Sequence, residues 1–391
     1  MTTSDIELAA GPVGARASSW QSVKAGFVPR PGYLVSPVVD FLCLGGASLI
    51  VLPLMVLLLP VESTRAEVIL IAALLANLIN HPHFAHSYQI FYRDFRTKAF
   101  GAQYSRGLRM RYVFAGIAVP LLLGGFFVGA SLAGAPRVLG LAVNAMGFAV
   151  GWHYVKQGYG MLMVDSVLKR RFFADREKKF FLVNGYAAWI FAWMMLNQTV
   201  AENDFWGLKY FTLAVPQPLI YAAGALLAAT TAALIVMLAR KASANGGKLP
   251  WVGLMAYATS LYVWVVLVRI NPLVLLVVPA FHSLQYLLVV WRFQWNLESD
   301  RANVGPAPVS RGKQLRRFAG FVVAGIVLGF MGFWFLPSAL QLGVAYDKAY
   351  LGPALFLFGF WLFINLHHYF IDNVIWRREN PDTKKYLFGA R

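Results

Sequence analysis

The chain has 391 residues, of which 59% are hydrophobic, 15% aromatic and only 13% charged, and its formal net charge is +18. This composition excludes an ordinary soluble domain and predicts an integral, multi-pass membrane protein whose first partner is the lipid bilayer. The basic residues lie between apolar runs instead of forming one cluster, which argues against nucleic acid as a partner. The single cysteine, Cys43, excludes an intrachain disulfide and a multi-cysteine metal or iron–sulfur site.

Apolar runs of about 20 residues, the length that crosses a hydrocarbon core, recur along the sequence. They predict a polar N-terminal tail over 1–34, a transmembrane domain over 35–376 and a basic C-terminal tail over 377–391. Breakers and charges separate the runs, as in "PVESTRAE" and "RKASANGGKLP". The predicted fold class is therefore all-α, a polytopic helix bundle with about ten transmembrane helices over residues 35–60, 66–91, 112–133, 138–164, 180–197, 211–239, 250–268, 272–291, 318–337 and 351–376.

The loops between these helices differ in their content of Lys and Arg. With the N-terminus inside, the inner segments carry 29 of the 35 basic residues and the outer loops carry five. Because cytoplasmic loops hold the excess of Lys and Arg in membrane proteins, both termini are predicted to be cytoplasmic. We expect the protein to lie in the inner or plasma membrane.

Histidine is scarce in this sequence, and its positions follow the predicted helices. All seven histidines fall in even-numbered helices, which run from outside to inside. The first inner charge follows nine to twelve residues after His83, His153, His282 and His368, which places these four about 13–18 Å below the inner interface at 1.5 Å per residue. The second helix carries three of them within the stretch "NHPHFAHSYQIFYRDF". Four helices can thus present imidazoles at one depth, namely His81, His83 and His86, then His153, then His282, and finally His367 with His368.

Polar residues inside a membrane are costly, and a group of them at one depth marks a functional interior. Imidazole favours Fe, Cu and Zn, so we predict a metal site. The expected ligands are His83, His86, His153, His282 and His368, while His81, His367 and the carboxylate of Asp372 are further candidates. An amide that follows its histidine by three or four residues is expected to orient that imidazole, and the amides in question are Gln89, Gln157 and Gln285.

A short internal similarity relates the second and eighth helices. "HSYQIFYR" and "HSLQYLLVVWR" share His-Ser-x-Gln followed by aromatic residues and Arg. Such a pairing is compatible with a pseudo-symmetric site, although eight residues are too few to indicate a duplication.

The histidine segments also carry a family resemblance. "HPHFAH" and "NLHHYFID" resemble the histidine boxes of integral-membrane non-haem iron oxygenases, the desaturase and hydroxylase group, and single histidines on several helices resemble the membrane carotene-cleaving dioxygenases of the Brp/Blh type. The HxxHH elements of the desaturases are missing. The resemblance implies one or two non-haem iron ions, a hydrophobic small-molecule substrate and, as a further partner, an electron donor. The expected function is thus a metal-dependent oxygenase, hydroxylase or desaturase of a lipid-soluble substrate.

Two other classes use histidines inside a membrane. One is an electron-transfer protein for haem b or a quinone, with imidazoles from facing helices as axial ligands. The other is a transporter or proton-coupled channel in which the histidines form a relay. The sequence lacks HExxH, a P-loop, GxGxxG followed by an acidic residue, and CxxCH, so the chemistry has to come from the imidazoles.

Overall fold

The computed structural model of the chain describes residues 29–199, 203–205, 208–303 and 310–389. These residues contain ten helical segments that are long and apolar enough to cross a membrane, which confirms the predicted all-α bundle of about ten spans. The loop between the fifth and sixth spans forms a small antiparallel hairpin from β1 (Asn203–Phe205) and β2 (Leu208–Tyr210). Residues 1–28 of the predicted N-terminal tail lie outside the described residues.

Five spans are continuous α-helices. They are the fourth, fifth, sixth, eighth and tenth spans, namely α8 (Pro136–Leu168), α9 (Asp175–Thr199), α10 (Gln217–Ala244), α13 (Val274–Asn303) and α17 (Leu355–Ile375). Three short helices lie between or after the spans: α5 (Phe95–Phe100), α16 (Lys348–Leu351) and α18 (Pro381–Phe388).

In the other five spans a five-residue segment interrupts the α-helix; it is π-helical in four of them, and in the first span it contains a kink at Gly45. Such segments are rare in proteins and occur frequently at functional sites. In chain order these spans are α1 (Pro37–Phe41), η2 (Leu42–Gly46) and α2 (Ala47–Leu58); α3 (Val61–Leu75), η3 (Ala76–Asn80) and α4 (His81–Tyr92); α6 (Arg106–Val113), η4 (Phe114–Ala118) and α7 (Val119–Leu132); α11 (Trp251–Ala258), η5 (Thr259–Val263) and α12 (Trp264–Ile270); and α14 (Arg311–Phe330), η6 (Met331–Phe335) and α15 (Leu336–Gly343).

Pro82 gives a physical reason for the π segment in the second span. Proline lacks an N–H, and its ring collides with the carbonyl four residues earlier in a regular α-helix. The wider π turn η3 ends at Asn80, two residues before Pro82, and relieves this conflict. The side chain of Asn80 then accepts a hydrogen bond of 2.8 Å from Ser283 on α13, which fixes the start of the histidine-bearing α4.

The kink in the first span depends on a glycine. Gly45 has a φ of +157° and a ψ of −25°, a backbone conformation that residues with a Cβ rarely adopt. A Cβ at this position would also lie 3.0 Å from Oγ1 of Thr259. Beside this turn, the side-chain amide of Gln285 on α13 donates a hydrogen bond of 2.9 Å to the carbonyl of Leu44.

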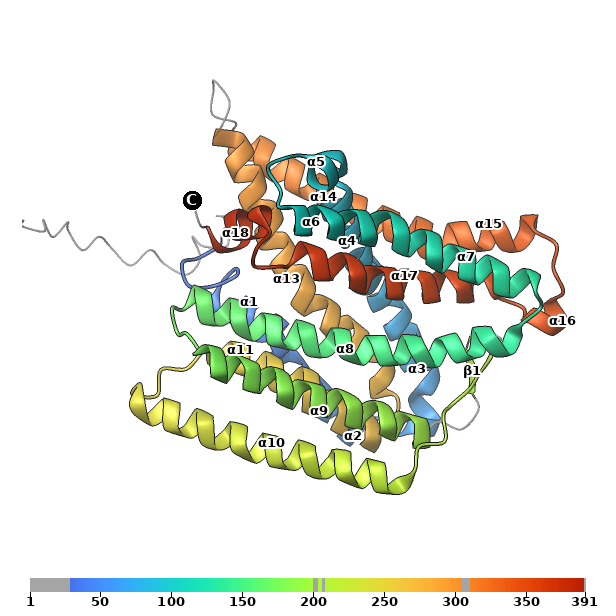
Figure 1. The fold of residues 1–391 in the computed structure, drawn as a ribbon, viewed down its shortest axis with the longest axis horizontal. Coiled ribbons are helices and arrows are strands. Elements are labelled where there is room, and N and C mark those ends of the chain that lie inside the picture. Colours follow the sequence, from blue (N-terminus) through green and yellow to red (C-terminus); the bar gives the residue numbers. More distant parts are fainter. Residues whose placement is uncertain (1–28, 200–202, 206–207, 304–309, 390–391) are drawn as a thin grey trace, which may run out of the picture.

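The spans form a bundle in which α8, α9 and α10 lie side by side, and α17 lies between α8 and α7 (Figure 1). The eighth span, α13, crosses obliquely behind α8 and α17 in this view (Figure 1). It packs against α4 and α8, and α17 packs against the same two helices. The four helices that carry the histidines are therefore neighbours, with α4 and α8 on either side of the pair α13 and α17.

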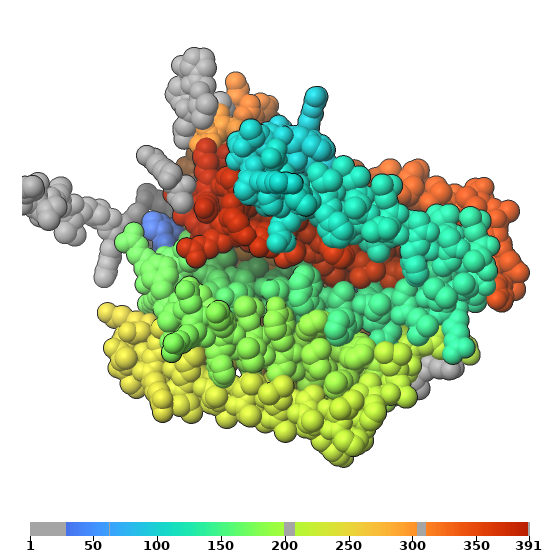
Figure 2. All heavy atoms as spheres, in the orientation of Figure 1, coloured from blue at the N-terminus to red at the C-terminus, as the bar shows by residue number. Residues whose placement is uncertain are grey.

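Large apolar side chains cover the outside of the spans. Leu57, Leu132 and Leu342 are 77%, 84% and 89% exposed, far more than leucine is in a soluble protein core. Figure 2 shows the side chains of α10, α9 and α8 as adjacent bands on one face, with α17 seen between the α8 and α7 bands. An apolar exterior on ten such helices identifies an integral, multi-pass membrane protein in a lipid environment.

The segment predicted as a basic C-terminal tail carries the helix α18, which docks on the bundle. The guanidinium of Arg292 donates to the carbonyl of Leu387 at 3.0 Å, and Asn296 donates to the carbonyl of Tyr386 at 2.7 Å. The hydroxyl of Thr383 donates to the carbonyl of Ile375 at the end of α17. Helices α18 and α1 lie at one end of the molecule, and α16 and β1 lie at the other (Figure 1).

Candidate metal centre

Four buried helices bring polar side chains together in the middle of the bundle. His83 comes from α4, His153 from α8 and His282 from α13, while His368 and Asp372 lie one turn apart on α17. Each of these five side chains is at most 7% exposed. The convergence follows from the packing of α17 and α13 against both α4 and α8.

Three imidazoles and one carboxylate form the tightest group. One ligand atom from each of His83, His153, His368 and Asp372 lies within 4.8 Å of the other three. Ligand atoms bound to one ion at about 2.1 Å are about 3 Å apart at a right angle and about 4.2 Å apart when opposite. The group is therefore slightly wider than a bound ligand set, so small side-chain movements would close it around an ion. We call these four residues the central cluster.

The atoms at the middle of the central cluster have no hydrogen-bond partner among the described residues. These atoms are Nε2 of His83, His153 and His368, and Oδ2 of Asp372. Nε2 of His368 lies 3.1 Å from Oδ2 of Asp372, but the two atoms are not aligned for a hydrogen bond. A buried polar atom without a partner costs about 1–3 kcal/mol. A metal cation would satisfy all four atoms at once and balance the buried carboxylate.

His282 lies at the edge of the central cluster. Its ring centroid is 5.6 Å from that of His83 and 5.0 Å from that of His153, and Nδ1 has no hydrogen-bond partner. The ring stacks on Tyr154 with a centroid distance of 4.0 Å and an angle of 16°. His282 is therefore a neighbour of the cluster, and the stacking contact restrains its approach to the centre.

A second layer of side chains orients the ligand atoms. The hydroxyl of Tyr286 donates to Oδ1 of Asp372 at 2.7 Å, and the indole N–H of Trp376 donates to the same hydroxyl at 3.2 Å. Ser283 lies 3.2 Å from Nδ1 of His83, and Ser87 lies 2.5 Å from the hydroxyl of Tyr286. These contacts occupy Oδ1 of Asp372 and Nδ1 of His83, so that the other atom of each group faces the centre, as metal sites require.

We expect Tyr286→Phe to weaken metal binding about 10- to 100-fold, because Asp372 loses the hydrogen bond that orients its carboxylate. Equilibrium dialysis of the detergent-purified protein against Fe(II) or Zn(II) measures the change. Tyr88→Phe is the matched control, since the hydroxyl of Tyr88 bonds to His367 outside the central cluster. Equal losses in both variants would contradict a specific role for Tyr286.

The three glutamines predicted to orient imidazoles behave differently from one another. The amide oxygen of Gln89 accepts a hydrogen bond of 2.6 Å from Nδ1 of its predicted partner His86. Gln157 donates instead to the backbone carbonyl of His282 at 2.8 Å and to the side chain of Gln285 at 3.2 Å. Gln157 and Gln285 thus connect α8, α13 and the turn at Gly45 in the first span. Their amides bind the backbone carbonyls of His282 and Leu44 instead of an imidazole ring.

The remaining three histidines point away from the central cluster. His86 stacks on Phe321 of α14 at a centroid distance of 4.4 Å, and His81 stacks on Phe333 of η6 at 4.0 Å. In His367 both ring nitrogens already have partners, the hydroxyl of Tyr88 at 2.6 Å and the carbonyl of Ala115 at 2.8 Å. The expected grouping of His86 with His83 is not found, because three residues along a helix leave the two side chains about 60° apart.

The contact between α4 and α14 depends on small residues opposite the outer histidines. A Cβ at Gly325 would lie 2.3 Å from Cε1 of His86, whose ring is held by Phe321 and Gln89. We expect Gly325→Ala to destabilise the protein by about 1–3 kcal/mol through overpacking. Gly320→Ala on the same helix, where the new Cβ meets nothing within 4 Å, is the control and leaves stability unchanged or slightly higher. Thermal unfolding in detergent compares them, and equal melting temperatures would contradict the close packing.

One feature of the sequence indicates the residues that orient the ligand atoms. Both copies of the His-Ser-x-Gln similarity place a serine directly after a histidine. In the structure these serines make reciprocal contacts, Ser87 of α4 with Tyr286 of α13, and Ser283 of α13 with His83 of α4. The repeated dipeptide therefore marks the line along which the two helices meet, whereas nothing in the sequence distinguishes the partner Tyr286 from the other aromatic residues nearby.

No protein-family model, curated protein or solved structure matches the chain. The resemblance to histidine-box oxygenases thus rests on the short histidine segments. The residues of the site form a buried His/Asp group that can hold a metal ion.

Proposed function

We propose that this protein is a membrane-embedded, metal-dependent oxidoreductase that holds non-haem iron in the central cluster and acts on a lipid-soluble substrate. One observation carries the proposal, the convergence of three unpartnered imidazole nitrogens and one unpartnered carboxylate oxygen at a buried point. A structural role for these residues would normally pair such atoms with each other or with the backbone.

The donor set favours iron among the common metals. It combines imidazole nitrogen with one carboxylate oxygen, the mixture that non-haem Fe(II) sites use, and it contains no thiolate. Zinc also accepts these ligands, so metal analysis has to decide between the two. The substrate is inferred to be lipid-soluble because the cluster lies within the transmembrane helices, whose outer surfaces are apolar.

The ring spacing favours non-haem metal over haem b. The centroids of His83 and His368 are 4.5 Å apart, and those of His153 and His368 are 5.0 Å apart. Two axial imidazoles stand on opposite faces of a porphyrin, which separates their rings completely. Rings that touch each other leave no space for a macrocycle between them.

The protein's own residues would supply ligands, orientation and exclusion of water. Tyr286 and Ser283 fix the ligand groups, while Tyr369 stacks on His153 at a centroid distance of 4.5 Å and Phe84 contacts His368 edge-on at 4.9 Å. An apolar surround of this kind strengthens charge interactions at the metal and keeps competing water away. Iron, when bound, would activate dioxygen towards a C–H or C=C bond, with electrons from a separate donor where the reaction needs them.

Metal analysis with an absorption spectrum of the detergent-purified protein tests the proposal. We expect about one non-haem iron per chain, or uptake of that amount from Fe(II), and oxygen consumption that depends on both iron and added membrane lipid extract. A Soret band would replace the proposal by the haem-b alternative. A protein that takes up no Fe, Zn or Cu would support the histidine relay of a transporter.

We also infer that both ends of the chain face the cytoplasm, in an inner or plasma membrane. The distribution of 29 basic residues in inner segments against five in outer loops supports this orientation. Labelling of an engineered cysteine at Ser105, in a variant with Cys43→Ser, reports the side of the loop before α6. Labelling by an impermeant reagent from outside intact cells would contradict the orientation.

A further inference from the structure

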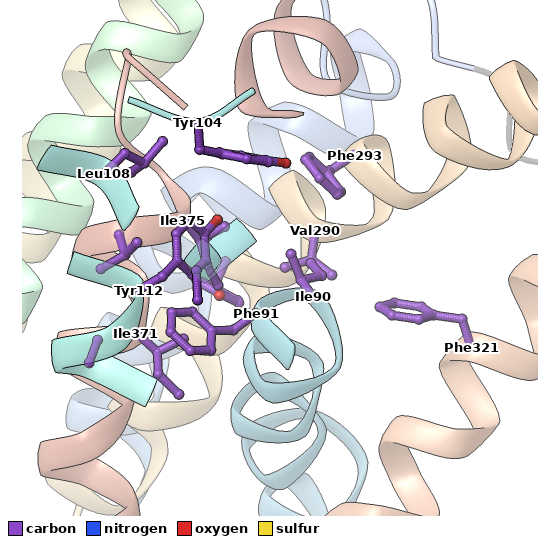
Figure 3. Close-up of a cluster of buried hydrophobic side chains, with 14 residues drawn as sticks. Ile90, Phe91, Tyr104, Leu108, Tyr112, Val290, Phe293, Phe321, Ile371 and Ile375 are labelled. Carbon is purple, nitrogen blue, oxygen red and sulfur yellow. The ribbon is translucent and has the colours of Figure 1, made fainter. Parts of the chain in front are cut away.

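A second polar site lies apart from the central cluster, at the end of the molecule that carries α18. A cavity of about 210 Å³ opens where α4, α5, α13 and α18 meet. Three of its lining side chains, Ile90, Tyr104 and Phe293, belong to the buried apolar cluster drawn in Figure 3. The cavity has room for several water molecules or for one small polar group.

Three basic side chains line this cavity, Arg93, Lys98 and Arg301. Arg93 donates a hydrogen bond of 2.7 Å to the neutral amide of Gln294. Lys98 is 5% exposed, and its ammonium donates to the carbonyl of Ile90 at 2.7 Å. An ammonium has three N–H donors, so two of them are free for another acceptor.

Lys98 and Arg301 each have one carboxylate partner, whereas the partner of Arg93 is the neutral amide of Gln294. The nearest carboxylate oxygen to Nζ of Lys98 is on Asp382, 3.9 Å away, and Arg301 pairs with Glu298 at 3.3 Å. Burial lowers the pKa of Lys98 to about 8, with Asp382 opposing this shift. Burial and then the charge of Arg301 lower the pKa of Arg93. An anion placed between these cations would relieve both effects.

Acidic side chains occupy the other part of the lining. Asp94 follows Arg93 directly and has a φ of +52°, an uncommon conformation that turns the chain from α4 into α5. Asp382 on α18 accepts a hydrogen bond of 3.3 Å from the hydroxyl of Tyr104. The cavity thus presents positive and negative groups together, which suits a ligand that carries both charges.

The position of the cavity identifies the source of such a ligand. Arg93 is the first residue after the apolar second span, so the cavity lies at the boundary between the hydrocarbon core and the headgroup region. Basic pockets between transmembrane helices at this depth bind lipid headgroups. The apolar side chains Ile90, Phe293 and Leu297 complete the lining beside the charges.

We propose that this cavity binds the phosphoethanolamine headgroup of a membrane phospholipid. The phosphate lies against Arg93, Lys98 and Arg301, and the ammonium group lies towards Asp94 and Asp382. The recognised chemistry is a phosphate with an amine beside it. The free headgroup could supply the same chemistry from solution, so the test includes both sources. The proposal is independent of the metal centre.

Native mass spectrometry of the detergent-purified full chain, titrated with phosphatidylethanolamine, phosphatidylglycerol or phosphatidylcholine, tests the proposal. We expect the wild-type protein to retain phosphatidylethanolamine at least about tenfold more strongly than the other two, since one charge-assisted contact corresponds to that factor. Arg93→Gln and Arg301→Gln should each reduce this retention about tenfold. The side chain of Arg301 is 47% exposed, so its replacement does not threaten the fold.

Arg106→Gln is the matched control, because Arg106 is an exposed basic residue of α6 outside the cavity lining. It should retain the lipid as the wild type does. Equal retention of all three lipids, or equal loss in the control, would overturn the site. Full saturation by soluble phosphoethanolamine or by inorganic phosphate at the same concentration would overturn the assignment to a membrane lipid.

Discussion

Replacing His153 by alanine is expected to abolish stoichiometric metal binding. His153 is the α8 residue of the central cluster, and its Nε2 is one of the unpartnered atoms at the centre. Loss of second-layer partners alone costs about 10- to 100-fold in metal affinity, so loss of a ligand should exceed about 100-fold. Elemental analysis after dialysis against a fixed concentration of free Fe(II) measures the effect.

His86→Ala is the matched control for this experiment. Its imidazole is equally buried and also stacks on an aromatic ring, but it faces α14 and lies away from the central cluster. Both substitutions remove the same atoms from a packed interior, so they should lower the melting temperature of the metal-free protein by similar amounts. The two variants should therefore differ only in metal content. If His86→Ala also loses the metal, or His153→Ala keeps it, the assignment of the central cluster is wrong.

Asp372→Asn should have the second large effect, and it acts on stability in two opposite ways. The amide keeps the shape of the side chain and an oxygen that can accept the hydrogen bond from Tyr286. It removes a negative charge from a residue that is only 7% exposed. Because a buried charge is costly, the metal-free variant should be as stable as the wild type or more stable. It also removes the only carboxylate of the central cluster, so the variant should gain no stability from added Fe(II).

Thermal unfolding with and without Fe(II) separates these two effects. A ligand at 100 times its dissociation constant stabilises the protein that binds it by about 2.7 kcal/mol, and the wild type should show a shift of this size. Asp165→Asn is the control, since Asp165 is a buried carboxylate that accepts a hydrogen bond of 2.9 Å from the backbone of Gly253, outside the central cluster. That variant should keep the Fe(II) shift. A full shift in Asp372→Asn would show that the carboxylate is not a ligand.

The histidine-bearing span shows where reasoning from sequence reaches its limit. The sequence predicts both His83 and His86 as ligands, and residues three apart lie on the same side of a helix. The structure turns His83 towards α13 and α17 and turns His86 towards Phe321 of α14. The offset of about 60° between the two side chains is enough to send them to different neighbours when helices surround α4 on all sides.

The π segments also rotate the helix that follows them, and the spacing of residues in the sequence does not predict this rotation. Each wide turn changes the direction in which the following residues project, and η3 ends directly before His81. Pro82 predicts a distortion, but the stacking of His81 on Phe333 depends on where η6 of a distant span lies. The hydrogen bonds of Tyr286 likewise join residues 86 and 199 positions apart in the chain.

The sequence by itself determined the properties that depend on local composition. The lengths of the apolar runs specify ten transmembrane helices, because a helix must cross about 30 Å of hydrocarbon with its backbone bonds satisfied internally. The distribution of histidines predicted which four helices meet at the site. Only the tertiary structure decided which rings face the same point, since helix rotation and π turns are set by packing between distant segments. Packing is also what places three imidazoles and Asp372 together and sends His81, His86 and His367 elsewhere.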